Sequence, residues 1–533
     1  MSRRQFILTS LAASAMQASP LKALAQQAKV SKQPFRWVPQ ADLSILDPVF
    51  TTAYITQEYG ELVFDTLYGL DANYAPHPQM AQGHTKSADG LTWTITLRKG
   101  LKFHDGSPVR AQDAVASIER WGQRDPMGMT FMAAVKQISA KDDGTMVIDL
   151  HEPFPMVPEA LGKPASNIAA IMPERLAKTS ASKAITEAVG SGPFRFLPAK
   201  RLLGSRVAYE RFAGYVPSPL KMAPSFTAGP KIVHVPGVEW HIIPDSATGI
   251  AALQAGEVDG VELVDNDFIP LLRGQPDIKL VKRSLPSISI MRFNQLYPPF
   301  NNKAMRQAIL AVVNQKEYMI AANGSEYPEY WNAHCGVFVP GSPMDSKAGM
   351  EALDGPRDFA KAQALIKAAG YHNEPIILLD PVDYPNHHAS AQVTAALFKK
   401  LKLNVVVQSM DWSTVLQRRN SQAAPASGGW NVAFTAITGT NNLDPAGQLG
   451  IRANGKKAWF GWPDDPKLVQ LRADWFKAPD LAARKKICEE IQKEAFDFVP
   501  YIPLGAIYSI TALRSNWQDF QLQMPLFYTL RQA

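Results

Sequence analysis

Segments with helical spacing of apolar residues alternate with short strand-like segments over much of this chain, and this alternation limits the folds that it can adopt. The clearest run spans residues 358–407. In order, it contains the helix cap Asp358, a helix through Phe359, Ala362, Ile366 and Ala369 that ends at Gly370, a strand at Ile376–Leu379, a helix at Ala389–Leu401 and a strand at Leu403–Val407. Strands that are joined through helices form right-handed crossovers and lie parallel in one sheet. The sequence therefore predicts an α/β fold with a partly parallel sheet.

Other stretches predict further elements of both kinds. Apolar residues alternate with threonines in Leu91–Leu97, and residues 138–150 have the pattern of a hairpin. We also expect a helix from Ala111, a helix capped by Ser246 that ends at Gly256, a strand at Val258–Val264, a helix capped by Asn302, a strand at Val432–Ala436, a helix at Leu481–Phe498 and a final strand at Tyr501–Leu513. One core does not normally support a chain of 533 residues, so we expect two or three domains.

Residues 1–25 have the layout of a Tat-type export signal. The layout consists of the pair Arg3-Arg4, Phe6, the short apolar stretch Leu11–Met16 and the small-residue site Ala23-Leu24-Ala25. The alternative is a disordered basic tail, which leaves all of these features to coincidence. We expect cleavage after Ala25. Because no cysteine precedes Cys335, we expect no lipid anchor and a mature protein that is free in a periplasm.

Charge and motifs argue against several classes of protein. Loss of the export signal removes three basic residues and no acid, which lowers the formal net charge from +7 to +4. A charge so small and dispersed does not favour nucleic-acid binding. The chain lacks the common metal, phosphate-loop and nucleophile motifs, so we expect no metal, no cofactor and no catalysis. Cys335 and Cys488 are equally compatible with one disulfide and with two buried thiols.

Several short motifs together resemble family 5 of the extracellular solute-binding proteins, which bind dipeptides, oligopeptides or nickel for ABC importers. The motifs are Leu46-Asp47-Pro48, Val63–Tyr68, Asp89–Trp93, Leu97–Gly106, Ala111–Val115, Gly190–Phe194, Ala252–Asp259, Phe293-Asn294, Pro298–Phe300, Met305–Ile309 and Val499–Leu504. They extend over nearly the whole mature chain. Most of them consist of turn residues or core residues, so we interpret them as structural. One departure is Arg110, which stands where the family usually has a hydroxyl side chain that caps the helix.

The resemblance implies a two-lobed periplasmic binding protein fold of type II, with an extra subdomain on lobe I. Lobe I would combine residues 29–77, 193–295 and 500–533, the extra subdomain would be residues 78–192, and lobe II would be residues 296–499. Closure of the lobes on a ligand would be a rigid-body motion about the chain crossings. The implied function is capture of a small, peptide-like or other organic solute and its delivery to membrane permease subunits with their ATPases. We expect a monomer.

Residues near the expected cleft are candidates for ligand contact. The first cleft loop of the family suggests Thr51, Thr52 and Tyr54 in lobe I. In lobe II, the candidates are Trp412, Trp430 and the loop residues Thr438, Thr440, Asn441 and Asn442. That loop follows the strand at Val432–Ala436, and ligands of open α/β sheets bind outside the carboxyl ends of strands. The alternative is that the tryptophans belong to a core and that the loop is only solvated.

The charge of this loop bears on the ligand. Peptide-binding relatives have an aspartate here that pairs with the ligand's ammonium group, whereas Thr440 and Asn441 are neutral. Asp444, next to Pro445, more closely resembles the structural residue that ends the loop. A buried ammonium group without a counter-ion is costly, so we hypothesise that peptides with a free α-amino group are not preferred. A sensor or chaperone role would use the same cleft, and a hydrolase is the remaining alternative.

Overall fold

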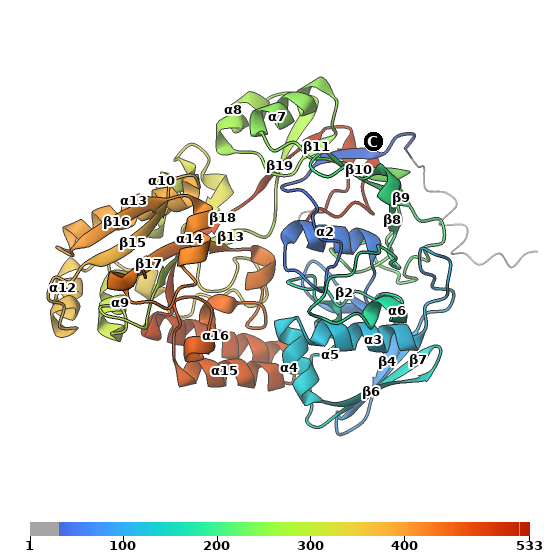
Figure 1. The fold of residues 1–533 in the computed structure, drawn as a ribbon, viewed down its shortest axis with the longest axis horizontal. Coiled ribbons are helices and arrows are strands. Elements are labelled where there is room, and N and C mark those ends of the chain that lie inside the picture. The colour runs from blue at the N-terminus through green and yellow to red at the C-terminus, as the bar shows by residue number, and fades with distance from the viewer. Residues whose placement is uncertain (1–30, 522) are drawn as a thin grey trace, which may run out of the picture.

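The computed structural model describes residues 31–521 and 523–533, which form two halves that lie side by side (Figure 1). The expected export signal, with Arg3, Arg4 and the cleavage site at Ala25, lies outside the described residues. Each half is built on its own sheet, and helices cover both sheets. The α/β class predicted from the alternating segments is confirmed.

A seven-stranded sheet forms the centre of the first half. Its strands, in spatial order, are β12 (Ile278–Lys282), β19 (Ile510–Arg514), β11 (Gly260–Val261), β1 (Phe35–Val38), β10 (Gly237–His241), β9 (Arg206–Arg211) and β8 (Phe194–Phe196). The central strand β1 is parallel to both of its neighbours, β10 and β11. Its side chains Phe35 and Trp37 are fully buried. Helices α2 (Tyr54–Val63), α7 (Ser246–Ala255) and α8 (Ile269–Leu272) belong to this half.

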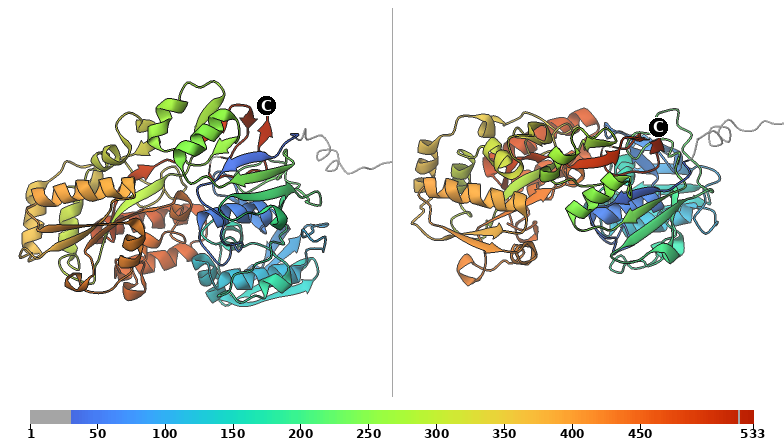
Figure 2. Two further views of the ribbon diagram at one scale, coloured as in Figure 1. Left: turned by 45° about the horizontal axis from the view of Figure 1, so that its top comes forward. Right: turned by 90° about the horizontal axis from the view of Figure 1, so that it is seen from above.

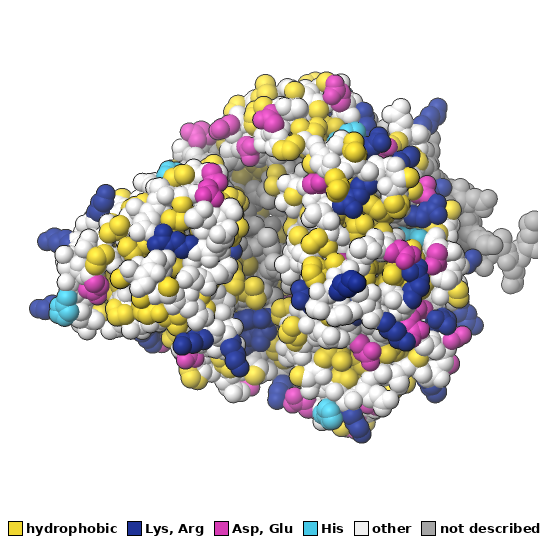
Figure 3. Space-filling model, in the orientation of Figure 1, with side chains coloured by type: hydrophobic (Ala, Val, Ile, Leu, Met, Phe, Trp, Pro, Cys, Tyr) yellow, Lys and Arg dark blue, Asp and Glu magenta, His cyan; other side chains and the backbone are white. Residues whose placement is uncertain are grey.

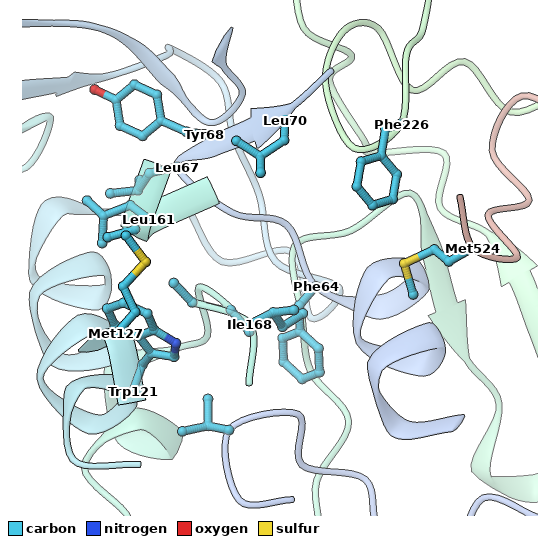
Figure 4. Close-up of a cluster of buried hydrophobic side chains, with 14 of the residues drawn as sticks. Phe64, Leu67, Tyr68, Leu70, Trp121, Met127, Leu161, Ile168, Phe226 and Met524 are labelled. Atoms are coloured by element: carbon cyan, nitrogen blue, oxygen red, sulfur yellow. The ribbon is translucent and has the colours of Figure 1, made fainter. Parts of the chain in front are cut away.

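A four-stranded antiparallel sheet extends the first half between residues 81 and 150. Its order is β4 (Ala81–Lys86), β5 (Thr92–Leu97), β7 (Thr145–Leu150) and β6 (Val135–Asp142), accompanied by α3 (Ala111–Gly122), α4 (Pro126–Ala134), α5 (Val157–Gly162) and α6 (Glu174–Ala177). The strand predicted at Leu91–Leu97 and the hairpin predicted at 138–150 are confirmed. Figure 4 shows the core beneath this layer, where Trp121, Met127 and Leu161 gather with Leu67 and Ile168.

A six-stranded sheet forms the second half. Its order is β14 (Trp331–Asn332), β18 (Tyr501–Ile507), β13 (Ser287–Phe293), β17 (Val432–Ile437), β15 (Ile376–Pro381) and β16 (Val405–Met410). The helices around it are α9 (Lys303–Leu310), α10 (Gln315–Asn323), α11 (Glu351–Asp354), α12 (Phe359–Ala368), α13 (Pro385–Lys400), α14 (Trp412–Arg418), α15 (Pro466–Lys477) and α16 (Leu481–Phe498). Strands β15 and β16 are parallel and joined through α13, as predicted. The predicted caps Asp358 and Asn302 both accept backbone hydrogen bonds from their helices.

The chain crosses between the two large sheets at two neighbouring points. One crossing, residues 283–286, joins β12 to β13, and the other, residues 508–509, joins β18 to β19. The crossings touch, because the Arg283 amide donates to the Ser509 carbonyl at 3.0 Å. Figure 2 shows these connections between the halves from two further directions.

The elements predicted at Ala389–Leu401 and Leu403–Val407 are shifted to α13 (Pro385–Lys400) and β16 (Val405–Met410), and three other predicted elements differ in pairing or in their cap. The single strand expected at Tyr501–Leu513 is divided into β18 and β19, because its two parts pair with different sheets. The strand expected at Val258–Val264 is reduced to β11, since only Gly260 and Val261 pair with neighbouring strands. The cap of α7 is Asp245, whose Oδ1 accepts from the Thr248 amide at 2.8 Å, and Ser246 is the first helical residue.

Both cysteines of the chain are buried free thiols. Cys335 and Cys488 lie in the second half, and the structure contains no bond between them. Burial raises the pKa of each thiol. Of the two alternatives that the sequence left open, the structure therefore has two buried thiols. Within residues 31–521 and 523–533, no helix combines the length and apolarity needed to cross a bilayer.

Candidate functional site

A hollow separates the two halves on the face shown in Figure 3. It contains two cavities, which we name after their positions. The hinge compartment, of about 210 Å³, lies at the chain crossings and is bordered by Tyr54, Glu262, Arg283, Ser287, Tyr384 and Ser509, among others. The flank compartment, of about 220 Å³, lies between the four-stranded layer and the helices α15 and α16. Thr440 borders both compartments.

A buried network of polar groups forms one wall of the hinge compartment. Arg283 Nη1 donates to Glu262 Oε1 at 3.2 Å, and its Nη2 donates to the Tyr54 hydroxyl. Glu262 Oε2 accepts from the Gln40 amide at 2.8 Å. Residues from α2, from the loop after β11 and from a crossing meet here. The wall therefore presents two groups to a ligand, the hydroxyl of Tyr54 and the guanidinium of Arg283. Their positions are set by the neighbouring residues.

Glu58 lies directly behind this wall. It follows Tyr54 by one helical turn of α2 and is fully buried, and neither carboxyl oxygen has a hydrogen-bond partner of the usual geometry among the described residues. Burial, together with the adjacent carboxylate of Glu262, raises the pKa of Glu58 well above its usual range, although Arg283 opposes this effect. These effects favour the neutral, protonated form of Glu58, while the ion pair of this wall is that of Arg283 with Glu262.

The flank compartment is mostly apolar and has walls from both halves. Leu70, Tyr74, Met127 and Met156 come from the first half, and Met344, Leu443 and Trp475 come from the second. Beside it, Glu159 of α5 and Arg484 of α16 form an ion pair across the hollow at 2.9 Å. Phe154 and Phe476 stack across the same boundary, with ring centroids 6.2 Å apart. The halves therefore touch at the flank as well as at the crossings.

Asp444 has two roles at the edge of the flank compartment. Its Oδ1 accepts from the amides of Ala446 and Gly447 at 2.8 and 3.2 Å, which closes the turn. Its Oδ2 has no hydrogen-bond partner among the described residues, and the residue borders the cavity. Burial raises the pKa of this carboxyl. The turn role expected from the Asp-Pro pair is present, and in addition a carboxylate oxygen is available at the cavity.

The structure distributes the predicted ligand-contact residues unevenly. Tyr54, Thr438 and Thr440 border the hinge compartment. Trp412 packs with His387 and with Tyr384, itself a hinge-compartment residue, at centroid distances of 5.0 and 5.3 Å.

The other predicted residues do not border either cavity. Trp430 is fully buried beside Phe460 and Trp462. Neither cavity is bordered by Thr51, Thr52, Asn441 or Asn442. The Asn442 amide group donates to the Ile437 carbonyl at 3.1 Å, so this side chain shapes the loop.

Sequence reasoning missed the charged wall of the hinge compartment. Glu262 and Arg283 lie 21 residues apart, in segments with no recognisable motif spacing. A role for Arg283 could have been suspected from its place between two strand-like segments, because a cationic side chain is unusual in a chain crossing. Nothing local indicates that Glu58 lies next to Glu262.

Comparisons with known proteins agree with this architecture. Residues 75–458 match the family described as bacterial extracellular solute-binding proteins, family 5 Middle. A probable peptide ABC transporter periplasmic-binding protein of Sinorhizobium fredii is 35% identical over 95% of this chain and 94% of its own length. A glutathione-binding protein of Salmonella paratyphi A is 28% identical over 90% of both chains.

Solved structures have the same fold at lower identity. The dipeptide-binding protein of Pseudoalteromonas sp. SM9913, in complex with Met-Leu, has a TM-score of 0.74 and 18% identity, covering 94% of this chain and 100% of that one. The agropinic acid complex of the binding protein AgaA from A. tumefaciens R10 has a TM-score of 0.74 and 21% identity, covering 94% and 99%. These similarities establish a two-lobed periplasmic binding protein fold.

Proposed function

The chain belongs to family 5 of the bacterial extracellular solute-binding proteins, the substrate-binding proteins of ABC importers, and we propose that it captures its solute in the two adjoining compartments between its halves. Membership of this family makes it a periplasmic binding protein and not an enzyme. The observation that carries the proposal is that Thr440 borders both a polar and an apolar cavity, each with walls from both halves.

The halves act as two lobes that close on the solute. Within the described residues, two short crossings join their main sheets, and the crossings lie side by side at the hinge compartment. A rotation there needs changes in few backbone torsions, which is the usual arrangement for hinge closure. We divide the chain as expected from the sequence, with residues 78–192 as the extra subdomain of lobe I. Because β13 and β18 pair in the six-stranded sheet, we move the lobe boundaries from 295/296 and 499/500 to residues 283–286 and 508–509.

The export route extends this proposal to residues outside the described structure. A Tat-type signal with Arg3 and Arg4, cleaved after Ala25, would deliver a protein without a lipid anchor to the periplasm. Mass spectrometry of the exported protein should give an N-terminus at Gln26. An intact N-terminus, or a mass increase from an acyl chain, would contradict this route.

The solute is a small peptide-like or other organic molecule with hydrogen-bonding groups. Arg283, Thr438 and Ser509 at the hinge compartment supply donors and acceptors, which a dry cleft requires the ligand to match. The loop at Thr440 is neutral, which supports the hypothesis that a free α-amino group is not preferred there. The feature that argues against this hypothesis is the available Oδ2 of Asp444, because a carboxylate oxygen at the flank compartment can pair with an ammonium group. Sub-micromolar binding of ordinary di- or tripeptides in calorimetry, abolished by Asp444→Ala, would overturn the hypothesis.

The proposed function is tested with protein purified from its own host. Native mass spectrometry is expected to detect a co-purified small molecule, and small-angle scattering is expected to detect compaction when that molecule is returned to stripped protein. A broad panel of solutes from a cell extract that produced no compaction would contradict capture by lobe closure. Delivery to an ABC permease and its ATPases is tested separately, by loss of uptake of that solute in a deletion strain.

A further inference from the structure

We propose that the solute is amphipathic, with a polar end in the hinge compartment and an apolar end about the size of an aromatic ring in the flank compartment. This inference rests on the proposed function and narrows the class of solute. It follows from the composition of the flank compartment, from its size and from its position next to the hinge compartment, with which it shares Thr440.

The flank compartment is chemically suited to an apolar group. Its exposed lining is mainly carbon, contributed by side chains such as Tyr74, Met156, Leu443 and Trp475. The other charged side chains that border it already have partners. Lys163 pairs with Asp125 at 2.8 Å, and Arg484 pairs with Glu159 at 2.9 Å. A few polar atoms at its edge lack a partner among the described residues, Arg484 Nε and Asp444 Oδ2 among them, so the cavity accepts an apolar group that has few polar contacts.

The size of the cavity limits the apolar group. An apolar cavity of about 150 Å³ binds benzene, and the flank compartment measures about 220 Å³. One aromatic ring system or one branched aliphatic chain therefore fills it, whereas a long acyl chain does not fit. Because Met156 and Leu443 come from different halves, a group placed between them contacts both and stabilises the closed arrangement.

The two compartments adjoin at Thr440, and we place one solute across both. This residue borders the apolar cavity and also the polar one that contains Glu262 and Arg283. A solute that occupied only one compartment would leave the other to water. A solute that buries one large apolar group in the flank compartment is expected to bind about 10- to 100-fold more tightly than the same solute without that group.

The test uses 5-fluoroindole as a ring-sized probe and follows its fluorine NMR signal as full-length mature protein is added. Saturable binding is expected with the native sequence. Leu443→Trp fills the compartment from one half and Met156→Trp fills it from the other, so each variant is expected to weaken binding of the probe at least tenfold. Two variants from opposite halves are used so that a folding defect in one, detected by its melting transition, does not decide the result.

Matched controls make the same substitutions on the surface. Leu203 and Met129 are 69% and 52% exposed, so Leu203→Trp and Met129→Trp are expected to leave binding of the probe unchanged. Absence of saturable binding to the native sequence, or equal binding to the cavity variants, would overturn the inference. If extract solutes still compact the protein in that case, the proposed function stands and only the amphipathic class is wrong.

Discussion

Asp47, in the first of the short motifs, is a structural residue. Its carboxylate accepts from Arg120 Nη1 and Nη2 at 3.1 and 2.6 Å and from the Ile185 amide at 2.9 Å. Both side chains are almost completely buried. The motif therefore ties the first half to α3 of the four-stranded layer. This agrees with the interpretation that the motifs identify the fold without binding the ligand.

Asp47→Asn is expected to lower the free energy of unfolding by about 3–5 kcal/mol, because it leaves the guanidinium group of Arg120 buried without a counter-ion. The measurement is urea unfolding followed by circular dichroism. Glu210→Gln removes one partner of the exposed pair with Arg195 and serves as the control, with an expected cost below about 1 kcal/mol. Equal effects of the two substitutions would show that Asp47 has no special role.

Glu58 predicts a specific pH dependence of stability. Because its pKa is raised in the folded protein, the folded state keeps a proton that the unfolded chain loses above about pH 4.3. The stabilisation that this group contributes is therefore fully present below that pH. It is lost as the pH rises through the pKa of Glu58 in the folded protein. Burial is the main cause of this shift, Glu262 adds to it and Arg283 opposes it, and Tyr54 and Tyr209 are the other titratable neighbours of Glu58.

Glu58→Gln removes the ionisable group with little change of shape. The melting temperature of this variant, relative to the native sequence, is expected to increase between pH 4 and pH 8. Glu119→Gln on the exposed face of α3 is the control and should give no such trend. A flat difference for Glu58→Gln across this range would mean that Glu58 is ionised in the folded protein.

At the scale of elements, helix ends were predicted better than strand partners. The bounds of α16 agree with the expected Leu481–Phe498, since Asp480 accepts from the Ala483 amide at its start. Helix α9 begins after Asn302, whose Oδ1 accepts from the Ala304 amide at 2.9 Å. Such caps involve residues two or three positions apart, so they can be recognised in the sequence.

Asn302→Ala is expected to cost α9 about 1 kcal/mol, because the Ala304 amide loses its acceptor. Amide hydrogen exchange of residues 303–310 measures this effect locally. Asn301 is the adjacent exposed residue, and Asn301→Ala should leave exchange in α9 unchanged. Similar exchange in the two variants would argue that Asn302 does not stabilise the helix.

At the scale of the whole molecule, contacts at the flank hold the halves together. The pair Glu159–Arg484 is mostly buried, with 20% and 11% of the side chains exposed, whereas the pair Glu152–Lys477 is exposed. The stacked rings of Phe154 and Phe476 lie in the same contact. Opening of the cleft must break these interactions. They therefore contribute to the free-energy difference between the open and closed arrangements of the ligand-free protein.

Arg484→Gln is expected to shift the equilibrium between the closed and open arrangements toward the open one by about 1.5–3 kcal/mol, which is the usual contribution of a hydrogen bond to a charged group. Small-angle scattering of the ligand-free protein should then give a larger radius of gyration. Lys477→Gln is the control on the exposed pair and should change the radius little. If the exchanged pair Glu159→Arg with Arg484→Glu did not restore the smaller radius, the contact would not control opening.

The sequence by itself determined the local features of this protein. Helix caps, turns such as Asp142-Asp143-Gly144 and the neutral loop at Thr440 follow from residues that are close together in the chain. Of the candidate contact residues, Tyr54, Thr438 and Thr440 border the hinge compartment, whereas Thr51 and Thr52, which lie nearer the same motif as Tyr54, do not.

Only the tertiary structure decided which sheet each strand joins and which groups meet in the cleft. Residues Tyr501–Leu513 read as one strand because their local pattern is continuous, yet β18 and β19 pair with strands of different halves. Trp430 was compatible with ligand contact or with a core position, and its full burial beside Phe460 places it in a core. Glu58, Glu262 and Arg283 come together from positions up to 225 residues apart. Such contacts arise from packing of the whole chain, and no local spacing records them.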